Sequence, residues 1–205
     1  MSWSGWWGWT RQWCGRITTP RALAPQPQGG AGPNHSRWPA EPADHAIGRS
    51  RGGPTTKIHA ACDGDGRPLA LHLTAGNVND TTQLDRVLAG IRVPRPSAGR
   101  PRTRPDYVVA DKGYSSRANR RLLRRRGIGH TIAEPADQRA HRRRRGRRGG
   151  RPVGFDKARY RRRNHIERCF NTLKQWRGIA TRYCKTATNY LGALHLRAIV
   201  IWATL

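Results

Sequence analysis

Four polar residues near the end of the chain are spaced so that one helix would carry them on a single face. They are Tyr160, Arg163, Glu167 and Lys174, in the stretch "YRRRNHIERCFNTLKQW". At about 100° per residue they fall within a stripe about 60° wide, beside the apolar stripe of the same helix. Glu167 is therefore expected at the edge of a buried face, flanked by cations. Two interpretations stay open: a solvated ion-pair stripe, or a site in which Glu167 takes part in chemistry.

A second acidic residue ends a short apolar stretch. The segment "DYVVAD" is β-branched and apolar, as in a buried strand, and Asp111 is its last residue. A carboxylate at the C-terminal end of a strand is well placed to hold a metal ion. An aspartate there is equally suited to capping the helix that follows. Asp111 by itself supports both interpretations.

The charge of the whole chain points to a polyanionic partner. Its 205 residues include 40 lysines and arginines against 12 acids, a formal net charge of +28. Such a chain repels itself and attracts nucleic acid through the phosphates. Arginine outnumbers lysine by 35 to 5, so a GC-rich coding sequence is a competing source of part of this charge.

The cysteines and the apolar runs exclude several classes of protein. Cys14, Cys62, Cys169 and Cys184 form no CxxC pair and no zinc-binding spacing, which fits a reducing compartment. The longest apolar run, "AIVIWATL", is too short to span a bilayer, and no signal-peptide pattern opens the chain. We therefore expect a cytoplasmic protein.

The elements that would position these residues follow from their periodicity. Residues 1–54 show no period and are expected to be irregular or disordered. Two alternating stretches, 55–62 and 67–75, flank the turn "DGDG" and predict a β-hairpin. A helix then starts near Asn79 or Asp80 and runs to about Ile91.

The second half of the chain predicts two more strands and several helices. A strand at 106–111 precedes a basic helix that ends at Gly127 and a short strand within 128–135. Residues 137–152 predict a basic loop, and two helices follow at about 156–176 and 188–202. Residues 55–205 are thus expected to form one mixed α/β domain.

Together, these motifs resemble the DDE transposases of bacterial insertion sequences, most closely the group of insertion sequence five. The spacing around Glu167 is similar to their tyrosine–arginine–glutamate–lysine signature, and "VVADKGYSSRANRRLLRRRGI" resembles the segment with their second catalytic aspartate. "EPADHAIGRSRGGPTTKIHAACDGDGRPLALHLTAGNVND" resembles the hairpin before it, so the resemblance covers about residues 41–205. It implies an RNase H-like mixed sheet with flanking helices. Asp111 and Glu167 would be the second and third acidic ligands.

The resemblance also implies an activity and partners. The chain would cut and join the DNA ends of an insertion sequence, with Mg²⁺ or Mn²⁺ held by Asp111 and Glu167. Two such ions about 4 Å apart stabilise the attacking and leaving oxygens, and carboxylates suit them. The implied partners are DNA and either a second copy of this chain or another transposase chain. The resemblance also implies a location at the nucleoid and no association with a membrane. The residues expected to contact DNA are Tyr160, Arg163, Lys174, Lys112, Arg161, Arg162, Arg142, Arg143, Arg144 and Arg145.

The first acidic ligand is missing from the place where the resemblance requires it. It should lie on a strand before the hairpin, but residues 1–40 contain no aspartate or glutamate. The next four aspartates fall in loops, turns or helix starts: Asp44, Asp63, Asp65 and Asp80. We therefore expect an inactive copy in which Asp111 and Glu167 still face each other. The sheet should be interrupted where the strand with the first ligand would lie, or residues near Arg11 to Thr18 should occupy that position weakly.

The tryptophan-rich start suggests why this ligand is missing. Five of the eight tryptophans lie in the first thirteen residues. Read from the third base of the Gly8 codon, the gene can spell V-D-S-T-V-V-R-A-H-H, with the aspartate fixed by the codons of Trp9 and Thr10. The first aspartate of the resembling group lies in such a segment. The hypothesis is that this start is read out of frame and that the frame is regained between about Pro20 and Glu41.

Two other classes of protein compete with a transposase. A non-catalytic, basic DNA-binding remnant would explain the charge and the missing ligand. A basic RNA binder of the ribosomal type would explain the charge, but neither the strand-borne Asp111 nor the spacing around Glu167. Metal-dependent nicking of DNA would separate a catalytic protein from a remnant.

Overall fold

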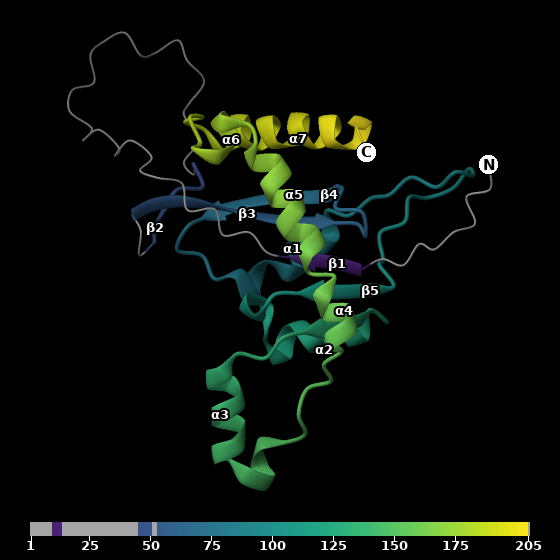
Figure 1. The fold of residues 1–205 in the computed structure, drawn as a ribbon, viewed down its shortest axis with the longest axis vertical. Coiled ribbons are helices and arrows are strands. Elements are labelled where there is room, and N and C mark those ends of the chain that lie inside the picture. Colours follow the sequence, from purple (N-terminus) through teal and green to yellow (C-terminus); the bar gives the residue numbers. More distant parts are fainter. Residues whose placement is uncertain (1–9, 14–44, 51–52, 205) are drawn as a thin grey trace.

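Two three-stranded sheets form the centre of the protein (Figure 1). The computed structural model describes residues 10–13, 45–50 and 53–204, and only the backbone of residues 10–13. The parallel sheet has the order β1-β5-β6, with β1 (Thr10–Trp13), β5 (Tyr107–Ala110) and β6 (Gly129–Ile132). The antiparallel sheet has the order β2-β3-β4, with β2 (Gly48–Ser50), β3 (Gly53–Cys62) and β4 (Pro68–Ala75).

The predicted hairpin is confirmed as β3 and β4. Their ladder pairs Ile58 with Leu73, and its register shifts at the turn end of β3. In the turn, the Asp63 carboxylate accepts hydrogen bonds from the backbone N–H groups of Asp65 and Arg67, at 3.0 and 2.9 Å. The aspartates of "DGDG" thus have the turn chemistry expected from the sequence.

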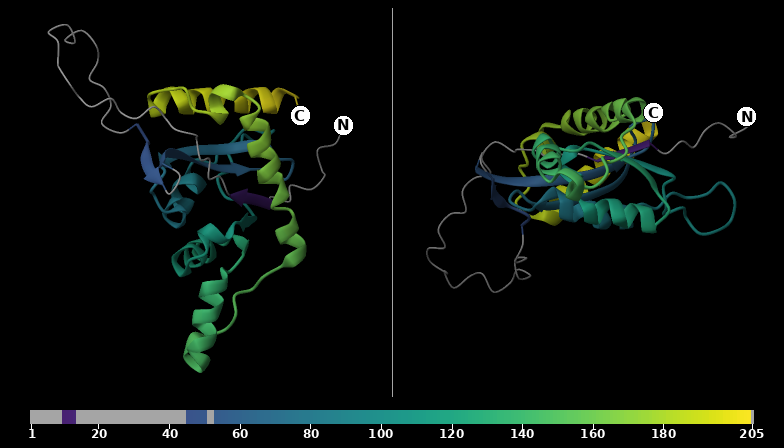
Figure 2. Two further views of the ribbon diagram at one scale, coloured as in Figure 1. Left: turned by 60° about the vertical axis from the view of Figure 1, so that its left-hand side comes forward. Right: turned by 90° about the horizontal axis from the view of Figure 1, so that it is seen from below.

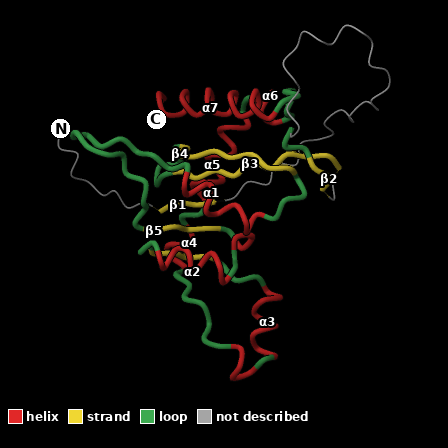
Figure 3. Tube along the Cα trace, turned by 180° about the vertical axis from the view of Figure 1, so that it is seen from behind, coloured by secondary structure: helices red, strands yellow, loops and turns green. Residues whose placement is uncertain are grey.

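β1 is the end strand of the parallel sheet and lies next to the antiparallel sheet without pairing with it. It pairs with β5 over its four residues, from Thr10 opposite Tyr107 to Trp13 opposite Ala110. It also lies beside β3, as the view from behind shows (Figure 3). Within the described residues no ladder connects β1 to β3. The sheet is therefore interrupted at the expected place, and the strand in the slot, "TRQW", contains no acidic residue.

Two hydrophobic cores lie on opposite faces of β3. Ala61 belongs to the core made by α1 (Leu84–Ala89), α2 (Arg117–Arg125), β5 and β6. Ile58, Ala60 and Cys62 belong to the core made by α5 (Asn164–Lys174), α6 (Arg177–Ala180) and α7 (Ala187–Thr204). In Figure 1, α7 lies above the antiparallel sheet and α2 below the parallel one. This arrangement is the mixed α/β fold that the element order predicts.

The structure departs from the expected elements at three places. The expected loop at 137–152 contains α3 (Ala136–Arg144) and a 3-10 turn, η3 (Gly146–Gly149). The expected helix at 156–176 is broken into α4 (Lys157–Arg161) and α5. The segment expected to be irregular contains β1 and β2.

The first departure has a local cause, whereas the second is not marked by composition. α3 follows Pro135, carries Asp137 in its first turn and basic residues in its last, all favourable for a helix. It buries no residue, so no apolar period announces it. The break before α5 falls at Arg162 and Arg163, which have ordinary helix propensity, so composition does not mark it.

In the described part of the chain, no helix has the length and apolar character needed to cross a membrane.

Candidate active site

Asp111 and Glu167 meet at the guanidinium of Arg163. Arg163 Nη1 lies 3.5 Å from Asp111 Oδ1, and Nη2 lies 2.5 Å from Glu167 Oε1. Since both nitrogens belong to one planar guanidinium, the two carboxylate oxygens are at most about 8 Å apart. Asp111 is the more buried of the two, with 18% of its side chain exposed against 46% for Glu167. The expected proximity of the two acids is confirmed, with the Arg163 guanidinium bound to both.

The end of β5 positions the Asp111 carboxylate. β5 is buried along most of its length, and Asp111 leaves it with extended backbone angles. The following 3-10 turn, η2 (Lys112–Tyr114), receives no cap hydrogen bond from this side chain. Ser116 caps α2 instead, by accepting a hydrogen bond from the N–H of Asn119 at 3.0 Å. The capping interpretation of Asp111 is therefore wrong.

The start of α5 positions the other two side chains. Arg163 precedes the first residue of α5, and Glu167 lies in its first turn, four residues later. The neighbouring face of this helix buries Ile166, Phe170 and Leu173 in the core, which fixes the orientation of α5. Glu167 is thus carried by a helix that the core holds in place.

The break before α5 changes the position of Tyr160. Tyr160 lies in α4, so the expectation of four residues on one continuous helix is wrong for it. Its ring still lies near the site, because the Arg163 guanidinium carbon is 5.8 Å from the ring centroid. The Tyr160 ring also packs near the ring of Phe155, with 5.0 Å between the two ring centroids.

Four other residues that are expected to contact DNA lie within two helical turns of the two acids or of Arg163 in the sequence. Lys112 is exposed directly after Asp111, and Arg161 and Arg162 are exposed at the end of α4. Lys174 lies about two turns further along α5 than Glu167. It is half-buried, and this burial lowers the pKa of its amine.

The remaining expected contacts are not brought to the carboxylates. Arg142 to Arg145 lie at the end of α3, which projects away from both sheets (Figures 1 and 2). Arg142 forms an ion pair with Glu134, while its three neighbours are exposed. The structure therefore separates the predicted basic residues into two groups.

Asp80 is a third carboxylate near Asp111 that the sequence interpretation assigned to a helix cap. It begins the 3-10 turn η1 (Asp80–Gln83), which Asn79 caps, and its Oδ1 pairs with Lys57 Nζ at 2.8 Å. Its Oδ2 and Asp111 Oδ2 lie 3.5 and 3.8 Å from the point that a Cβ on Gly113 would occupy. The missing side chain of Gly113 thus leaves open a space that both carboxylates border.

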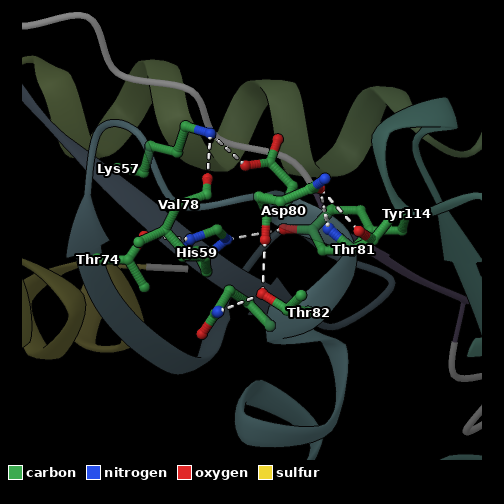
Figure 4. A network of polar contacts seen from close by, with 10 residues as sticks. Lys57, His59, Thr74, Val78, Asp80, Thr81, Thr82 and Tyr114 are labelled. Carbon is green, nitrogen blue, oxygen red and sulfur yellow. Dashed lines mark hydrogen bonds and ion pairs between the residues drawn. The ribbon is translucent and has the colours of Figure 1, made fainter. Parts of the chain in front are cut away.

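A buried polar network holds the turn that follows Asp111 (Figure 4). The His59 ring lies between two hydroxyls, with Nδ1 2.9 Å from Tyr114 Oη and Nε2 2.8 Å from Thr74 Oγ1. Burial lowers the pKa of His59 to about 4, so the ring is neutral at pH 7. Tyr114 is buried and ends η2. The network therefore anchors the chain three residues after Asp111, and no sequence signal announced it.

The residues present do not make a complete metal site. The carboxylates of Asp111 and Glu167 are the hard donors that Mg²⁺ prefers. Both are paired with Arg163, so an ion between them would have to displace its guanidinium. Among residues 10–13, 45–50 and 53–204, no three His, Cys, Asp or Glu side chains are grouped to hold a metal ion. Two carboxylates alone are an incomplete set of ligands.

Known proteins are similar to this chain over most of its length. The family model described as "Transposase DDE domain" matches residues 24–202. A putative transposase for insertion sequence element IS402 from Burkholderia cepacia is 43% identical over 98 residues, or 48% of this chain and 46% of that protein. A putative transposase for IS6501 from Brucella ovis is 32% identical over 148 residues, or 72% of this chain and 98% of that protein. The chain thus spans about half of the first relative and nearly all of the second.

Proposed function

Because this chain belongs to the family of transposases with a DDE domain, which has an RNase H-like fold, we propose that it is a DNA transposase of an insertion sequence. The observation that carries the proposal is the cluster of Asp111, Arg163 and Glu167. Its two acids come from the end of a buried strand and the start of a packed helix, far apart in the sequence.

We propose that Asp111 and Glu167 are two of the acids that act on the scissile phosphate. The Arg163 guanidinium lies between the two carboxylates, and its positive charge offsets part of their mutual repulsion. When bound, a divalent ion, Mg²⁺ or Mn²⁺, stabilises charge on the oxygens at phosphorus. Among the described residues, this chain offers an incomplete set of ligands for that ion. β1, the strand at the position expected for the first acidic ligand, carries no acid. This copy would therefore not cut DNA by itself.

Exposed cations beside the carboxylates support DNA as the substrate. Lys112, Arg161 and Arg162 are exposed within a few residues of the acids or of Arg163. Cations at such positions hold backbone phosphates and leave sequence unread. DNA binding would then tolerate many sequences and weaken steeply with salt, at the nucleoid of a bacterial cell.

The experiment restores the missing acid. In the test chain, residues 9–18 read V-D-S-T-V-V-R-A-H-H, the segment that the shifted frame can spell. We expect the parent to bind plasmid DNA without nicking it, and the restored chain to nick supercoiled DNA in Mg²⁺ or Mn²⁺. Nicking should be lost in the restored chain with Asp111→Asn or Glu167→Gln, and retained with Asp156→Asn. Asp156 is a matched control, because it is an exposed acid that caps α4.

Two results would overturn the proposal. One is a restored, folded chain that binds DNA but never nicks it with either ion. The other is nicking that survives both Asp111→Asn and Glu167→Gln, because the activity would then belong to other residues or to a contaminant.

A further inference from the structure

A groove lined by arginines separates α2 from the segment formed by α3 and η3. Its volume is about 820 Å³, and nine arginines and two carboxylates line it. We propose that this arginine groove binds the phosphodiester backbone of DNA, as a site separate from Asp111 and Glu167. The choice of DNA over RNA rests on the proposed function, whereas the recognition of phosphate rests on the groove itself.

Most of the positive charge in the groove is free to meet a ligand. Arg142 is committed to Glu134, and Arg120 donates to Ser115 Oγ at 3.0 Å and to the Ile132 carbonyl at 3.1 Å. The other seven arginines that line the groove are exposed. Facing rows of cations repel each other, and an anion between them relieves this repulsion. Arginine is also the side chain best suited to forked hydrogen bonding with phosphate oxygens.

The lining favours a polymer of phosphates over a small molecule. Pockets for small ligands are mostly apolar with a few polar groups, whereas this groove has arginine on both walls. A single phosphate or carboxylate would neutralise only a small part of that charge. Duplex DNA carries one negative charge per about 1.7 Å along its axis, so a backbone segment can neutralise several arginines at once.

The position of α3 supports the same ligand. α3 buries none of its residues and projects from the body of the protein (Figures 1 and 2). Its arginines therefore do not serve the core. The helix holds a cationic wall opposite α2, at a place that the Asp111 carboxylate does not share.

Neighbouring arginines of α3 and η3 differ in whether they line the groove. Arg144 and Arg148 line it, while Arg143 and Arg147 do not. All four are exposed, and each pair is spaced by four residues. Of the four consecutive arginines expected to contact DNA, the groove thus selects Arg142, Arg144 and Arg145.

The test compares two doubly substituted full-length chains with equal charge. Binding of a fluorescent 30-base-pair duplex is measured by anisotropy over a series of salt concentrations. Each lost phosphate contact should reduce the log–log salt slope by about 0.9. We expect Arg144→Gln/Arg148→Gln to reduce the slope by about 2 and Arg143→Gln/Arg147→Gln to leave it nearly unchanged. Glutamine keeps the helix propensity at Arg143 and Arg144 of α3, and circular dichroism verifies the fold of both chains.

A second variant probes the opposite wall. Arg121→Gln/Arg124→Gln on α2 should reduce the slope by a similar amount, because both residues line the groove and are exposed. Equal losses in the groove pair and the outward pair would overturn the inference, since total charge would then suffice to explain binding. Asp65→Asn, in the β3–β4 turn and outside both the groove and the pair of acids, should not reduce the slope. The predicted slopes, together with a restored chain that never nicks DNA, would refute the proposed function and leave this inference standing.

Discussion

Replacing His59 should change how the stability of the protein depends on pH. The neutral ring lies in the core between two hydroxyls, and burial is the largest cause of its low pKa, with Asp80 opposing it in part. The pKa falls from 6.5 to about 4 on folding. At about 1.4 kcal/mol per unit, this difference corresponds to about 3 kcal/mol. Because the unfolded chain binds the proton first, this stability is present above pH 6.5 and is lost as the pH falls to 4.

The assay is urea unfolding of the parent chain and of His59→Gln between pH 7.5 and 4.5. Glutamine can donate to one hydroxyl and accept from the other, but it does not titrate. The free energy of unfolding of the parent should fall relative to the variant by about 2 kcal/mol between pH 7.5 and pH 5. His195→Gln, at an exposed position of α7, removes an imidazole outside the core and should follow the parent. A constant gap between parent and His59→Gln at every pH would refute the reasoning.

Three further outcomes are expected. Tyr190→Phe removes the donor of a buried 2.7 Å hydrogen bond to the Ile179 carbonyl and should lower the free energy of unfolding by about 2 kcal/mol in urea titrations. Gly76→Ala places a Cβ 1.9 Å from Thr55 Oγ1 and 2.8 Å from the Thr55 carbonyl oxygen, so its unfolding midpoint should drop clearly, whereas Gly154→Ala meets nothing within 4 Å and should not drop. Sequencing the gene should give codons for V-D-S-T in the shifted frame around codons 8–18, and any other segment there refutes the out-of-frame hypothesis.

The elements that could be predicted are those with an apolar face against a core. β3 and β4 alternate, α1 and α7 carry apolar side chains into the two cores, and the structure confirms all four. α3 could not be recognised in this way, because a helix without buried residues leaves no periodic pattern. The break before α5 was also missed, because Arg162 and Arg163 have ordinary helix propensity and composition does not mark it.

The same distinction applies to the candidate site. Asp111 and Glu167 each follow from a local motif, and the motif order suggested that they meet. The approach of Asp80 to Asp111 depends on η1 and η2 lying side by side and on the absence of a side chain at Gly113. His59 is one residue in an alternating strand, and its role requires Tyr114, which is 55 residues away. Neither relation is encoded in spacing along the chain.

β3 belongs to both hydrophobic cores, and this has a consequence for how the molecule opens. Its successive side chains enter opposite cores, so neither half can unfold while the other keeps a complete interior. The amide hydrogens of β3 should therefore exchange with deuterated water only through global unfolding and be the last to disappear. Those of α3, which has no share in either core, should exchange by local fraying. A protein assembled around an interrupted sheet would thus still unfold as one cooperative unit.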